Sequence, residues 1–328
     1  MLSLTTPDQL AGLLSVKVGH LIDVLRNTNR HLRAFDICNS GNPNKVRRVV
    51  SARPPLYNLQ RAFLRAVLLP NLTSSLSNHG GVRGRSIRTN ALAHVDQHFV
   101  YTTDISDFFP SIRAERVKAW FERIGCSPRV SWMCARLCTA DGRLQQGLIT
   151  SPFIADQLMI PVDRQIIRAC ERLDPPLVYT RYVDDISISG RFDLETSRFP
   201  QLVRRILKLN GFRAKVEKEQ FGTLEEGTAV TKVRVRNGRL DVQKEYAVEL
   251  VRTLHDHISL GAGDRFTGPY YTREQLWGKV SFASWVNPGR RPQLLGKLRM
   301  IDWEQALAHA QGRGFITARS VRVGKDTP

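Results

Sequence analysis

The chain has 328 residues, of which 42% are hydrophobic and 24% are charged. This composition is typical of a folded protein with a substantial core and excludes a disordered chain. The formal net charge of +19 at pH 7 creates a long-range field for polyanions and favours nucleic acid as the partner. No apolar run could span a bilayer and the first residues do not resemble a signal peptide, so we expect a cytoplasmic protein that binds no membrane.

The sequence contains five cysteines, Cys38, Cys126, Cys134, Cys138 and Cys170. They include no Cys-x-x-Cys pair, and no nearby histidine completes a zinc site with Cys134 and Cys138. Cysteine is among the residue types most often buried. We therefore expect buried free thiols.

The first part of the chain combines helical, cationic and glycine-rich segments. Apolar spacing predicts an N-terminal helix over 7–32, which Thr6 caps. A basic strand over 45–54 and a helix over 56–68 follow. Residues 80–87, Gly-Gly-Val-Arg-Gly-Arg-Ser-Ile, predict a loop in which backbone amides and forked arginine donors can approach phosphate.

Two later segments carry aspartates at the ends of strands. An apolar strand ends on Asp104, and strands over 177–183 and 186–189 enclose Asp184 and Asp185 at the tip of a predicted hairpin. An aspartate pair in a turn is most often only solvated. Carboxylates at such a tip can nevertheless hold a divalent metal ion, and the strand that ends on Asp104 adds a third carboxylate.

The rest of the chain is mainly helical. Apolar periodicity predicts helices over 113–125, 128–138, 151–173, 195–210, 246–258, 272–286 and 292–310. Residues 212–221 predict a strand. The Asn-Gly pair at 237–238 lies between alternating runs and predicts a hairpin over 229–242.

Three segments resemble, in chain order, motifs of the reverse transcriptases. Residues 104–112 end in Asp-Phe-Phe-Pro-Ser-Ile and resemble the Asp-x-x-x-Phe-Phe-Pro-Ser-Ile form of bacterial members. Residues 145–152 are similar to Pro-Gln-Gly-x-x-x-Ser-Pro, and residues 182–185 match Tyr-x-Asp-Asp. Residues 90–94, Asn-Ala-Leu-Ala-His, match the Asn-Ala-x-x-His signature of retron reverse transcriptases. The resemblance covers roughly residues 45–305.

The resemblance implies an α+β fold of the right-hand polymerase type, with fingers, a palm whose antiparallel sheet is backed by helices, and a helical thumb. The domains it implies are an N-terminal helical segment at 1–38, fingers at 39–98, a palm at 99–243 with a fingers insertion at about 113–140, a thumb at 244–311 and a basic tail at 312–328.

The activity implied by the resemblance is RNA-directed DNA polymerisation with two Mg²⁺ ions, for which Mn²⁺ is a possible substitute. The catalytic carboxylates would be Asp104, Asp184 and Asp185, and the backbone carbonyl of Ile105 would join them as a metal ligand. Asp107 would lie outside this set. The residues implied to bind the nucleotide are Arg48, Arg85, Phe109, Gln146 and Lys218.

Among these residues, the Phe109 ring would collide with a 2′-hydroxyl and so select deoxynucleotides, whereas Lys218 would protonate pyrophosphate. The residues expected to contact nucleic acid are Asn90, His94, Arg290, Arg291 and Lys297. The partners that the resemblance implies are deoxynucleotides, a structured non-coding RNA that serves as template and primer, its short single-stranded DNA product, and an effector protein from the same locus. Anti-phage defence is the biological role it suggests.

Several alternatives remain open at this point. Val183 stands where alanine is commoner in retrons, and Lys232 stands where glycine is expected. A non-retron defence or group II-like reverse transcriptase is therefore an alternative. A protein of another class, a catalytically idle RNA-binding scaffold, would show no Mg²⁺-dependent primer extension. An RNA-dependent RNA polymerase is disfavoured by Phe109.

Overall fold

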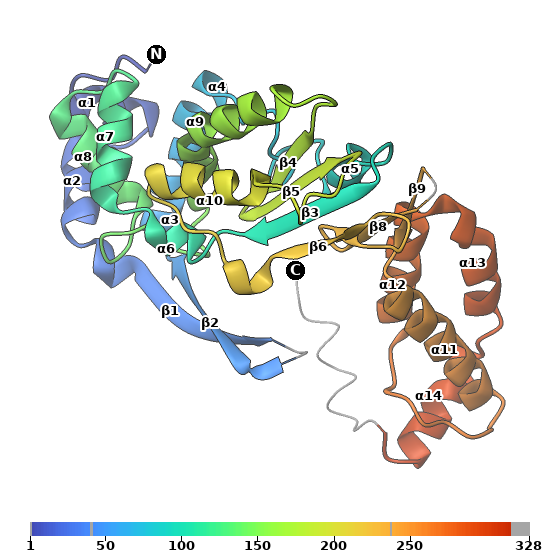
Figure 1. Ribbon diagram of the computed structural model, residues 1–328. Coiled ribbons are helices and arrows are strands. Elements are labelled where there is room, and N and C mark those ends of the chain that lie inside the picture. Colours follow the sequence, from blue (N-terminus) through green and yellow to red (C-terminus); the bar gives the residue numbers. More distant parts are fainter. Residues whose placement is uncertain (1, 40–41, 237, 316–328) are drawn as a thin grey trace. The chain divides into compact units, whose positions relative to one another are not determined.

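The computed structural model describes residues 2–39, 42–236 and 238–315, and the chain divides into two compact units (Figure 1). Unit one comprises Met1–Ser86 and Phe99–Phe221, and unit two comprises Ile87–His98 and Gly222–Pro328. The predicted basic tail at 312–328 lies outside the described residues from position 316 onward.

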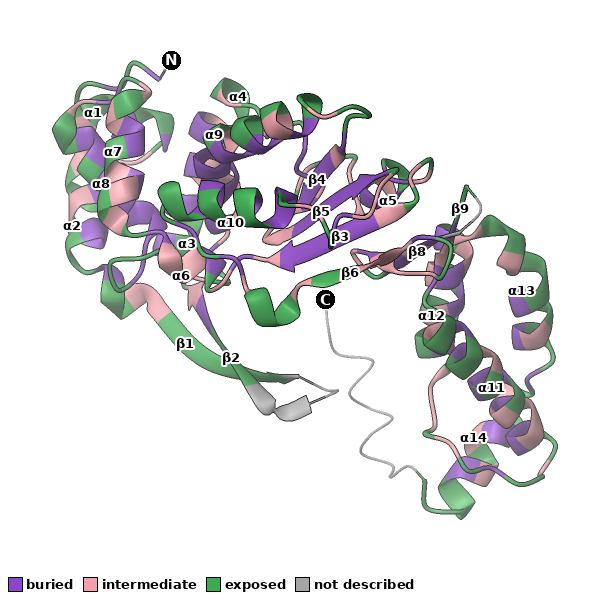
Figure 2. Cartoon of the chain, in the orientation of Figure 1, coloured by how far each residue is buried: buried purple, intermediate pink, exposed green. Residues whose placement is uncertain are grey.

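A sheet with strand order β4-β5-β3-β6 forms the centre of unit one. Its antiparallel strands are β3 (Phe99–Asp104), β4 (Val178–Tyr182) and β5 (Asp185–Gly190), and β6 (Gln220–Thr223) follows where the chain passes to unit two. Successive residues of β3 and β5 are buried, so both faces of these strands are covered (Figure 2). The predicted catalytic hairpin is confirmed to within one residue at each strand end.

Helices surround this sheet. α9 (Ser151–Glu171) packs against β4, and α10 (Phe199–Leu209) packs against α9. α10 begins later than the predicted position 195 because Pro200 stands in its first turn. Further helices of unit one are α1 (Pro7–Leu13), α2 (Val18–Arg26), α3 (Leu56–Phe63), α4 (Leu69–Asn71), α6 (Phe108–Ser111), α7 (Ala114–Arg123) and α8 (Pro128–Cys138). α3 continues as a π-helical turn over Leu64–Leu68, so the prediction over 56–68 is confirmed, as are those over 113–125, 128–138 and 151–173.

One apolar core joins these helices to the sheet. Its fully buried members come from helices distant in the chain and include Leu10, Phe63, Phe121, Met133 and Ile154. Burying a large apolar side chain of this kind contributes about 1.5–3 kcal/mol. The core therefore fixes the sheet, and with it the ends of the strands that carry the aspartates.

The prediction of a single N-terminal helix over 7–32 is wrong. α1 begins as predicted, because the Thr6 hydroxyl accepts a hydrogen bond from the backbone of Gln9 at 3.3 Å. The helix ends at Leu13, since Ser15 adopts a left-handed φ of 56°. α2 follows, and the chain then enters β1 (Leu32–Asn39), a strand that the sequence did not reveal.

β1 pairs antiparallel with β2 (Asn42–Ala52), which confirms the predicted basic strand over 45–54. The two strands form a ribbon whose described residues are largely exposed away from the body of unit one (Figure 2). Cys38 lies on this ribbon and is exposed, so the prediction of burial is wrong for this thiol. The other four cysteines are buried and free.

Unit two combines a small antiparallel sheet with helices. The sheet has the order β7-β8-β9, made of β7 (Ala229–Val230), β8 (Val233–Arg236) and β9 (Arg239–Val242). This confirms the hairpin predicted over 229–242, although Asn237 of its turn lies outside the described residues. The helices are α5 (Ile87–Leu92), α11 (Lys244–Gly261), α12 (Arg273–Val286), α13 (Arg291–Arg299) and α14 (Trp303–Gly312).

The helix predicted over 292–310 is interrupted. α13 ends at Arg299, and the Asp302 carboxylate accepts a hydrogen bond from the backbone of Gln305 at 3.1 Å. An N-terminal cap of this kind starts a new helix, α14, rather than continuing the old one. None of the described helices is both long and apolar enough to cross a bilayer.

Candidate active site

The central sheet brings three carboxylates to one end of unit one. Asp104 is the last residue of β3 and is the direct cross-strand partner of Asp185, the first residue of β5. Asp184 lies in the turn between β4 and β5. Its backbone carbonyl accepts a hydrogen bond from the Ile105 N–H at 2.9 Å, so the end of β3 is tied to that turn.

Electrostatics at this cluster favour a cation. Burial raises the pKa of Asp184, and the nearby Asp104 charge raises it further. Opposing this, Lys218 and Arg47 lower it. The Lys218 ammonium forms an ion pair with Asp104. Carboxylates that repel one another and already attract an ammonium suit a hard divalent cation, which prefers oxygen ligands.

The arrangement stops short of a complete metal cluster. Among the described residues, no group of three or more His, Cys, Asp and Glu side chains is gathered closely enough to hold a metal by itself. The substrate's phosphate oxygens ordinarily complete such sites when the ion is Mg²⁺. The assignment of the three aspartates and the Ile105 carbonyl as metal ligands stays a prediction.

Asp184→Asn is expected to raise the melting temperature of the metal-free protein at about pH 8. A carboxyl whose pKa is raised by folding binds more protons in the folded state, so its contribution to stability is lost as pH rises through that pKa. Asparagine cannot ionise, and the gain should shrink as pH falls and disappear below about 4, the ordinary pKa of an aspartate, because the carboxyl then becomes protonated in the unfolded chain as well as in the folded protein. Thermal unfolding in EDTA measures the difference. The exposed Asp107→Asn is the control, and a lower melting temperature for Asp184→Asn would contradict the prediction.

The prediction of a strand over 212–221 is wrong for most of its length, and the structure that replaces it brings Lys218 to Asp104. The backbone N–H of Lys215 donates to the Asp104 carbonyl at 2.7 Å. The chain then makes a 3₁₀ turn over Val216–Lys218, and β6 begins only at Gln220. Backbone donors that serve this turn are not available for a regular ladder.

Phe109 lies close to the carboxylates in the chain and is half-buried at the start of α6. Its neighbour Phe108 is buried, with its ring centroid 5.3 Å from that of Phe109 and 5.8 Å from that of Phe212. The two phenylalanines therefore differ in environment. Phe108 belongs to the core, and Phe109 retains a partly open face.

The basic strand β2 is joined to the loop that carries Gln146. The Val50 N–H donates to the Gln146 carbonyl at 2.8 Å. Gly147 has a φ of 104°, and a Cβ there would lie 2.5 Å from Val49 Cγ1 and 2.6 Å from the Val50 carbonyl oxygen. Glycine is thus required for this close approach. The side chains of Arg48 and Gln146 are both exposed.

Arg85 organises the loop in which it lies. Its Nη1 donates to the backbone carbonyls of Ser75, Leu76 and Asn78 at 2.6, 3.0 and 2.6 Å. Half of the guanidinium fork is therefore committed to the loop, and the side chain is held in place by it. The expectation that Arg85 also binds a triphosphate stays a prediction.

The expected nucleic-acid contacts belong to unit two and differ in environment. Asn90 and His94 are buried, and the Asn90 amide donates to the Thr231 hydroxyl at 2.7 Å. Arg290 forms a two-pronged ion pair with Asp241 at 2.6 and 2.7 Å. Lys297 Nζ lies 2.7 Å from His255 Nε2, and Arg291 is exposed. Asn90 thus stabilises the turn between β7 and β8.

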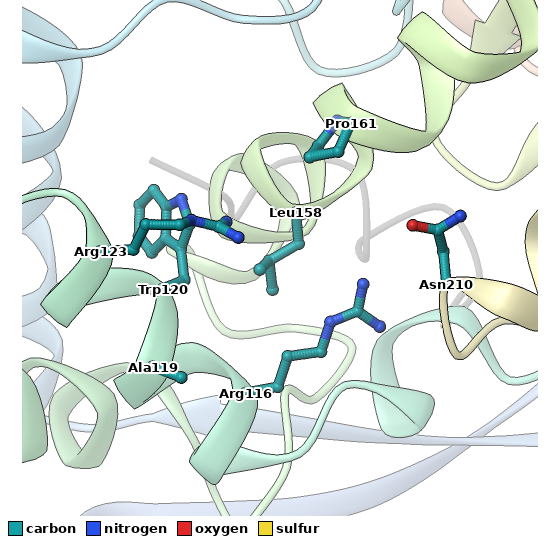
Figure 3. Close-up of a pocket in the computed structure, with 7 residues that line it drawn as sticks. All are labelled: Arg116, Ala119, Trp120, Arg123, Leu158, Pro161 and Asn210. Carbon is teal, nitrogen blue, oxygen red and sulfur yellow. The ribbon is translucent and has the colours of Figure 1, made fainter.

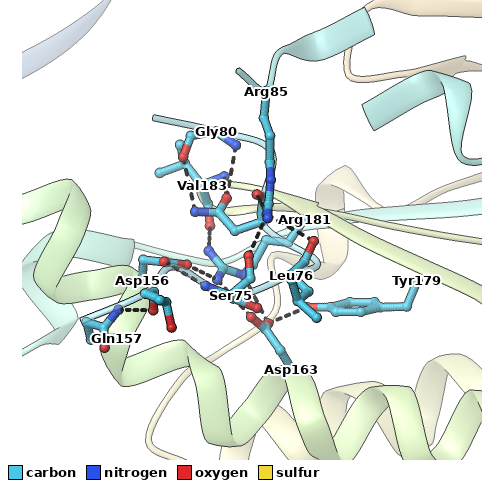
Figure 4. A network of polar contacts seen from close by, with 12 residues as sticks. Ser75, Leu76, Gly80, Arg85, Asp156, Gln157, Asp163, Tyr179, Arg181 and Val183 are labelled. Atoms are coloured by element: carbon cyan, nitrogen blue, oxygen red, sulfur yellow. Dashed lines mark hydrogen bonds and ion pairs between the residues drawn. The ribbon is translucent and has the colours of Figure 1, made fainter. Parts of the chain in front are cut away.

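A buried polar network that the sequence did not reveal lies directly behind the β4–β5 turn (Figure 4). Arg181 of β4 is 0% exposed and forms ion pairs with Asp156 and Asp163 of α9. Tyr179 also donates to Asp163, at 2.7 Å. The available signal was an arginine inside a buried strand, because such a charge requires a partner, and two aspartates seven residues apart on one helix face.

A separate hollow of about 180 Å³ lies among α7, α9 and the end of α10 (Figure 3). The guanidinium groups of Arg116 and Arg123 point into it. Burial and the Arg123 charge lower the pKa of Arg116. Its lining residues are Arg116, Ala119, Trp120, Arg123, Leu158, Pro161 and Asn210. None of the expected site residues is among them, so this hollow is distinct from the carboxylate site.

Comparison with known proteins identifies the class. A model of the family described as reverse transcriptase (RNA-dependent DNA polymerase) matches residues 47–249. The chain belongs to this family and is an RNA-directed DNA polymerase. Membership implies a right-hand polymerase fold and the use of divalent metal ions, in agreement with the mixed α/β architecture and its antiparallel sheets.

Similar curated proteins are retron enzymes. The chain is 29% identical to the retron Mx65 reverse transcriptase of Myxococcus xanthus, over 88% of this chain and 70% of that protein. It is 27% identical to the Mx162 enzyme of the same organism, over 78% and 58%, and 25% identical to the retron Ec86 enzyme of Escherichia coli, over 82% and 81%. The predicted resemblance to retron-type reverse transcriptases is thereby confirmed.

Proposed function

We propose that this polymerase copies a dedicated structured RNA into short single-stranded DNA by two-metal nucleotidyl transfer. The observation that carries the chemistry is the pairing of Asp104 with Asp185 across β3 and β5, beside Asp184 in the turn. The observation that supports the template is the similarity to retron enzymes over most of the chain. In this proposal the protein works in the bacterial cytoplasm in an anti-phage retron, with an effector protein from the same locus.

The carboxylates have distinct proposed roles. Asp104 and Asp184 would both be ligands of two Mg²⁺ ions, and Asp185 and the Ile105 carbonyl would complete the protein's ligands. When bound, such ions activate the primer hydroxyl and neutralise charge on the transferred phosphoryl group. Lys218, which forms an ion pair with Asp104, is proposed to protonate the leaving pyrophosphate.

The nucleotide is held by residues from three segments of unit one. Arg48 and Arg85 are proposed to bind the triphosphate, since guanidinium groups match phosphate with forked hydrogen bonds. Gln146 is proposed to contact the nucleotide or the template. The backbone hydrogen bond between Val50 and Gln146 supports a joint role for β2 and the loop that carries Gln146, because it fixes their positions relative to each other.

We assign the polymerase subdomains as proposals. The fingers would comprise 39–98 and an insertion at about 113–140, the palm 99–243, and the thumb 244–311. Unit one contains the sheet with the aspartates, which supports the palm. The helices α11 to α14 in unit two support the thumb, where Arg291 and Lys297 would follow a nucleic-acid backbone.

Phe109→Ala is expected to reduce discrimination against ribonucleotides by roughly 100-fold, because the partly open face of the ring would no longer exclude a 2′-hydroxyl. Single-nucleotide incorporation of ATP and dATP gives the two values of kcat/KM. The exposed aromatic Tyr57→Ala is the control and should leave selectivity unchanged. Equal use of ATP and dATP by the wild type would instead favour an RNA-dependent RNA polymerase.

The function is tested by expressing the protein with its native flanking DNA and purifying it with bound nucleic acid. Denaturing gels are run before and after RNase or DNase treatment, and the Asp184→Asn, Asp185→Asn double variant is the control. A discrete short DNA, linked to RNA and missing in the double variant, is the expected result. RNA alone in both samples would contradict the proposal and favour a binding scaffold.

A further inference from the structure

The turn that carries Asp184 has an unfavourable backbone conformation. Two residues, Val183 and Asp184, join β4 to β5, and Val183 has a φ of 61°. A tight hairpin turn with a positive φ at its first central position normally has glycine there. A β-branched residue disfavours the left-handed region strongly. Contacts from elsewhere in the fold must therefore hold this turn.

Two side chains form hydrogen bonds to the backbone of Val183, one to its carbonyl and one to its N–H. Arg181 Nη1 donates to the Val183 carbonyl at 2.8 Å, and the Val183 N–H donates to Asn78 Oδ1 at 3.2 Å. The Val183 carbonyl belongs to the peptide that leads directly into Asp184. Both side chains are buried, whereas Val183 itself is half-buried.

The Arg181 guanidinium is itself held in place by two carboxylates of α9 (Figure 4). Its Nε and Nη2 donate to the two Asp163 oxygens at 3.0 and 2.9 Å, and Nη2 also donates to Asp156 at 2.7 Å. Burial alone would lower the pKa of Arg181, but the Asp163 carboxylate outweighs it and the pKa is raised. The guanidinium thus stays charged and anchors the turn to α9.

Asn78 is fixed by a strap, which we define as residues 75–85. The strap runs beside β4 as a parallel bridge: Arg181 N–H donates to the Ser77 carbonyl at 2.8 Å, and His79 N–H donates to the Arg181 carbonyl at 2.7 Å. Asn78 Oδ1 also accepts from the Gly80 N–H at 3.0 Å. A Cβ on Gly80 would lie 2.5 Å from Val183 Cγ2, so strap and turn are in close contact.

We propose that Asn78 and Arg181 are positioning residues that clamp Val183 in its left-handed conformation and thereby preset Asp184 for divalent metal. The inference rests on the proposed two-metal function. It goes further by assigning the placement of a metal ligand to side chains that touch neither metal nor substrate.

The strap also links the two ends of the proposed nucleotide site. Arg85 is bonded through Nη1 to the carbonyls of Ser75 and Asn78, within the strap that holds the turn. The first strap residue, Ser75, donates its N–H to Asp156 Oδ2 at 3.1 Å. Arg85, proposed to bind the triphosphate, and Asp184, proposed to bind metal, are therefore both connected through hydrogen bonds to the buried Asp156 of α9.

The test compares Asn78→Ala, Val183→Gly and the double variant. Loss of Asn78 releases the Val183 N–H, so we expect Mn²⁺ affinity to fall by about 10–100-fold, the scale on which partners of metal ligands act. Glycine adopts a positive φ without a clamp. Adding Val183→Gly should therefore restore the affinity to within roughly 3-fold of wild type, whereas a purely structural role for Asn78 would not be rescued in this way.

Free Mn²⁺ is measured by electron paramagnetic resonance, and primer extension is followed across Mn²⁺ concentrations. Thermal unfolding in EDTA reports folding independently of metal. The matched control is Asn58→Ala, an exposed asparagine on α3. Arg181→Lys is the second variant, since it keeps the buried charge but shortens the fork that reaches Val183, and it should show the same loss of affinity.

The outcomes distinguish a failure of the proposed clamp from a failure of the proposed two-metal function. A folded Asn78→Ala protein with wild-type Mn²⁺ affinity would overturn the clamp, and so would a folded double variant that is not rescued. If Asn78→Ala does not fold, wild-type affinity in Arg181→Lys overturns it instead. Failure of the wild type to bind Mn²⁺ at all would overturn the proposed two-metal function.

Discussion

Asp104→Asn is expected to lower the rate of primer extension by at least about 10³-fold. The substitution removes a charge that faces Asp185 across the sheet and that already attracts the Lys218 ammonium. In the proposed two-metal site, the divalent cation would thereby lose an anionic ligand at the point where charge develops in the transition state. Extension of a labelled primer on an RNA template, at saturating deoxynucleotide and Mg²⁺, measures the rate.

The nearby Asp107→Asn is the matched control. Asp107 is exposed, precedes α6 and has a φ of 47°, a conformation that asparagine tolerates well. It should extend primers at close to the wild-type rate. Similar losses in both variants would show that the local fold, rather than the Asp104 carboxylate, is responsible, and equal activity of Asp104→Asn and wild type would remove Asp104 from the site.

Arg181→Met is expected to lower the free energy of unfolding by about 3–5 kcal/mol, the usual cost of removing one partner from a buried ion pair. The change leaves Asp156 and Asp163 buried without their guanidinium, and Tyr179 cannot replace its charge. Urea denaturation followed by circular dichroism gives the free energy from the midpoint and slope. The exposed Arg168→Met on α9 should change it little.

A triple variant tests whether Arg181→Met destabilises the protein through the loss of its ion pairs or through the burial of two unpaired carboxylates. Replacing Asp156 and Asp163 by asparagine in the Arg181→Met background removes the two unpaired carboxylates. If the buried unpaired carboxylates cause the instability, the triple variant should regain roughly half or more of the free energy of unfolding that Arg181→Met loses. A triple variant less stable than Arg181→Met would show that hydrogen bonding to the carboxylates, not charge, dominates the network.

Local signals in the sequence predicted much of the fold. The β4–β5 hairpin, α7, α8, α9 and β8–β9 are confirmed because apolar periodicity and turn residues within each segment specify them. The errors have two causes. Local features that apolar periodicity does not capture end two helices: the N-terminal helix breaks at the left-handed Ser15, and α13 and α14 separate at the Asp302 cap. A tertiary contact accounts for the third error, because the strand expected over 212–221 gives way to the turn that brings Lys218 to Asp104.

The candidate site was predicted unevenly for a similar reason. Asp104, Asp184 and Asp185 stand in recognisable short patterns, so sequence alone indicated them and their common chemistry. The clamp on Val183 was not visible, because it joins Asn78, Arg181 and Asp163 from distant parts of the chain. Periodicity assigns such residues to elements, but it cannot state which side chains meet.

The cysteines divide into one accessible thiol and four enclosed ones, and this division determines how the protein can be labelled. Burial raises the pKa of Cys126, and it raises those of Cys138 and Cys170 to about 12, while Cys134 is shifted upward as well. Because the thiolate is the nucleophile, these four should react slowly with maleimides. Cys38 on the β1–β2 ribbon is exposed. A fluorophore attached there, without any cysteine substitution, would report directly on whether the ribbon moves when nucleic acid binds.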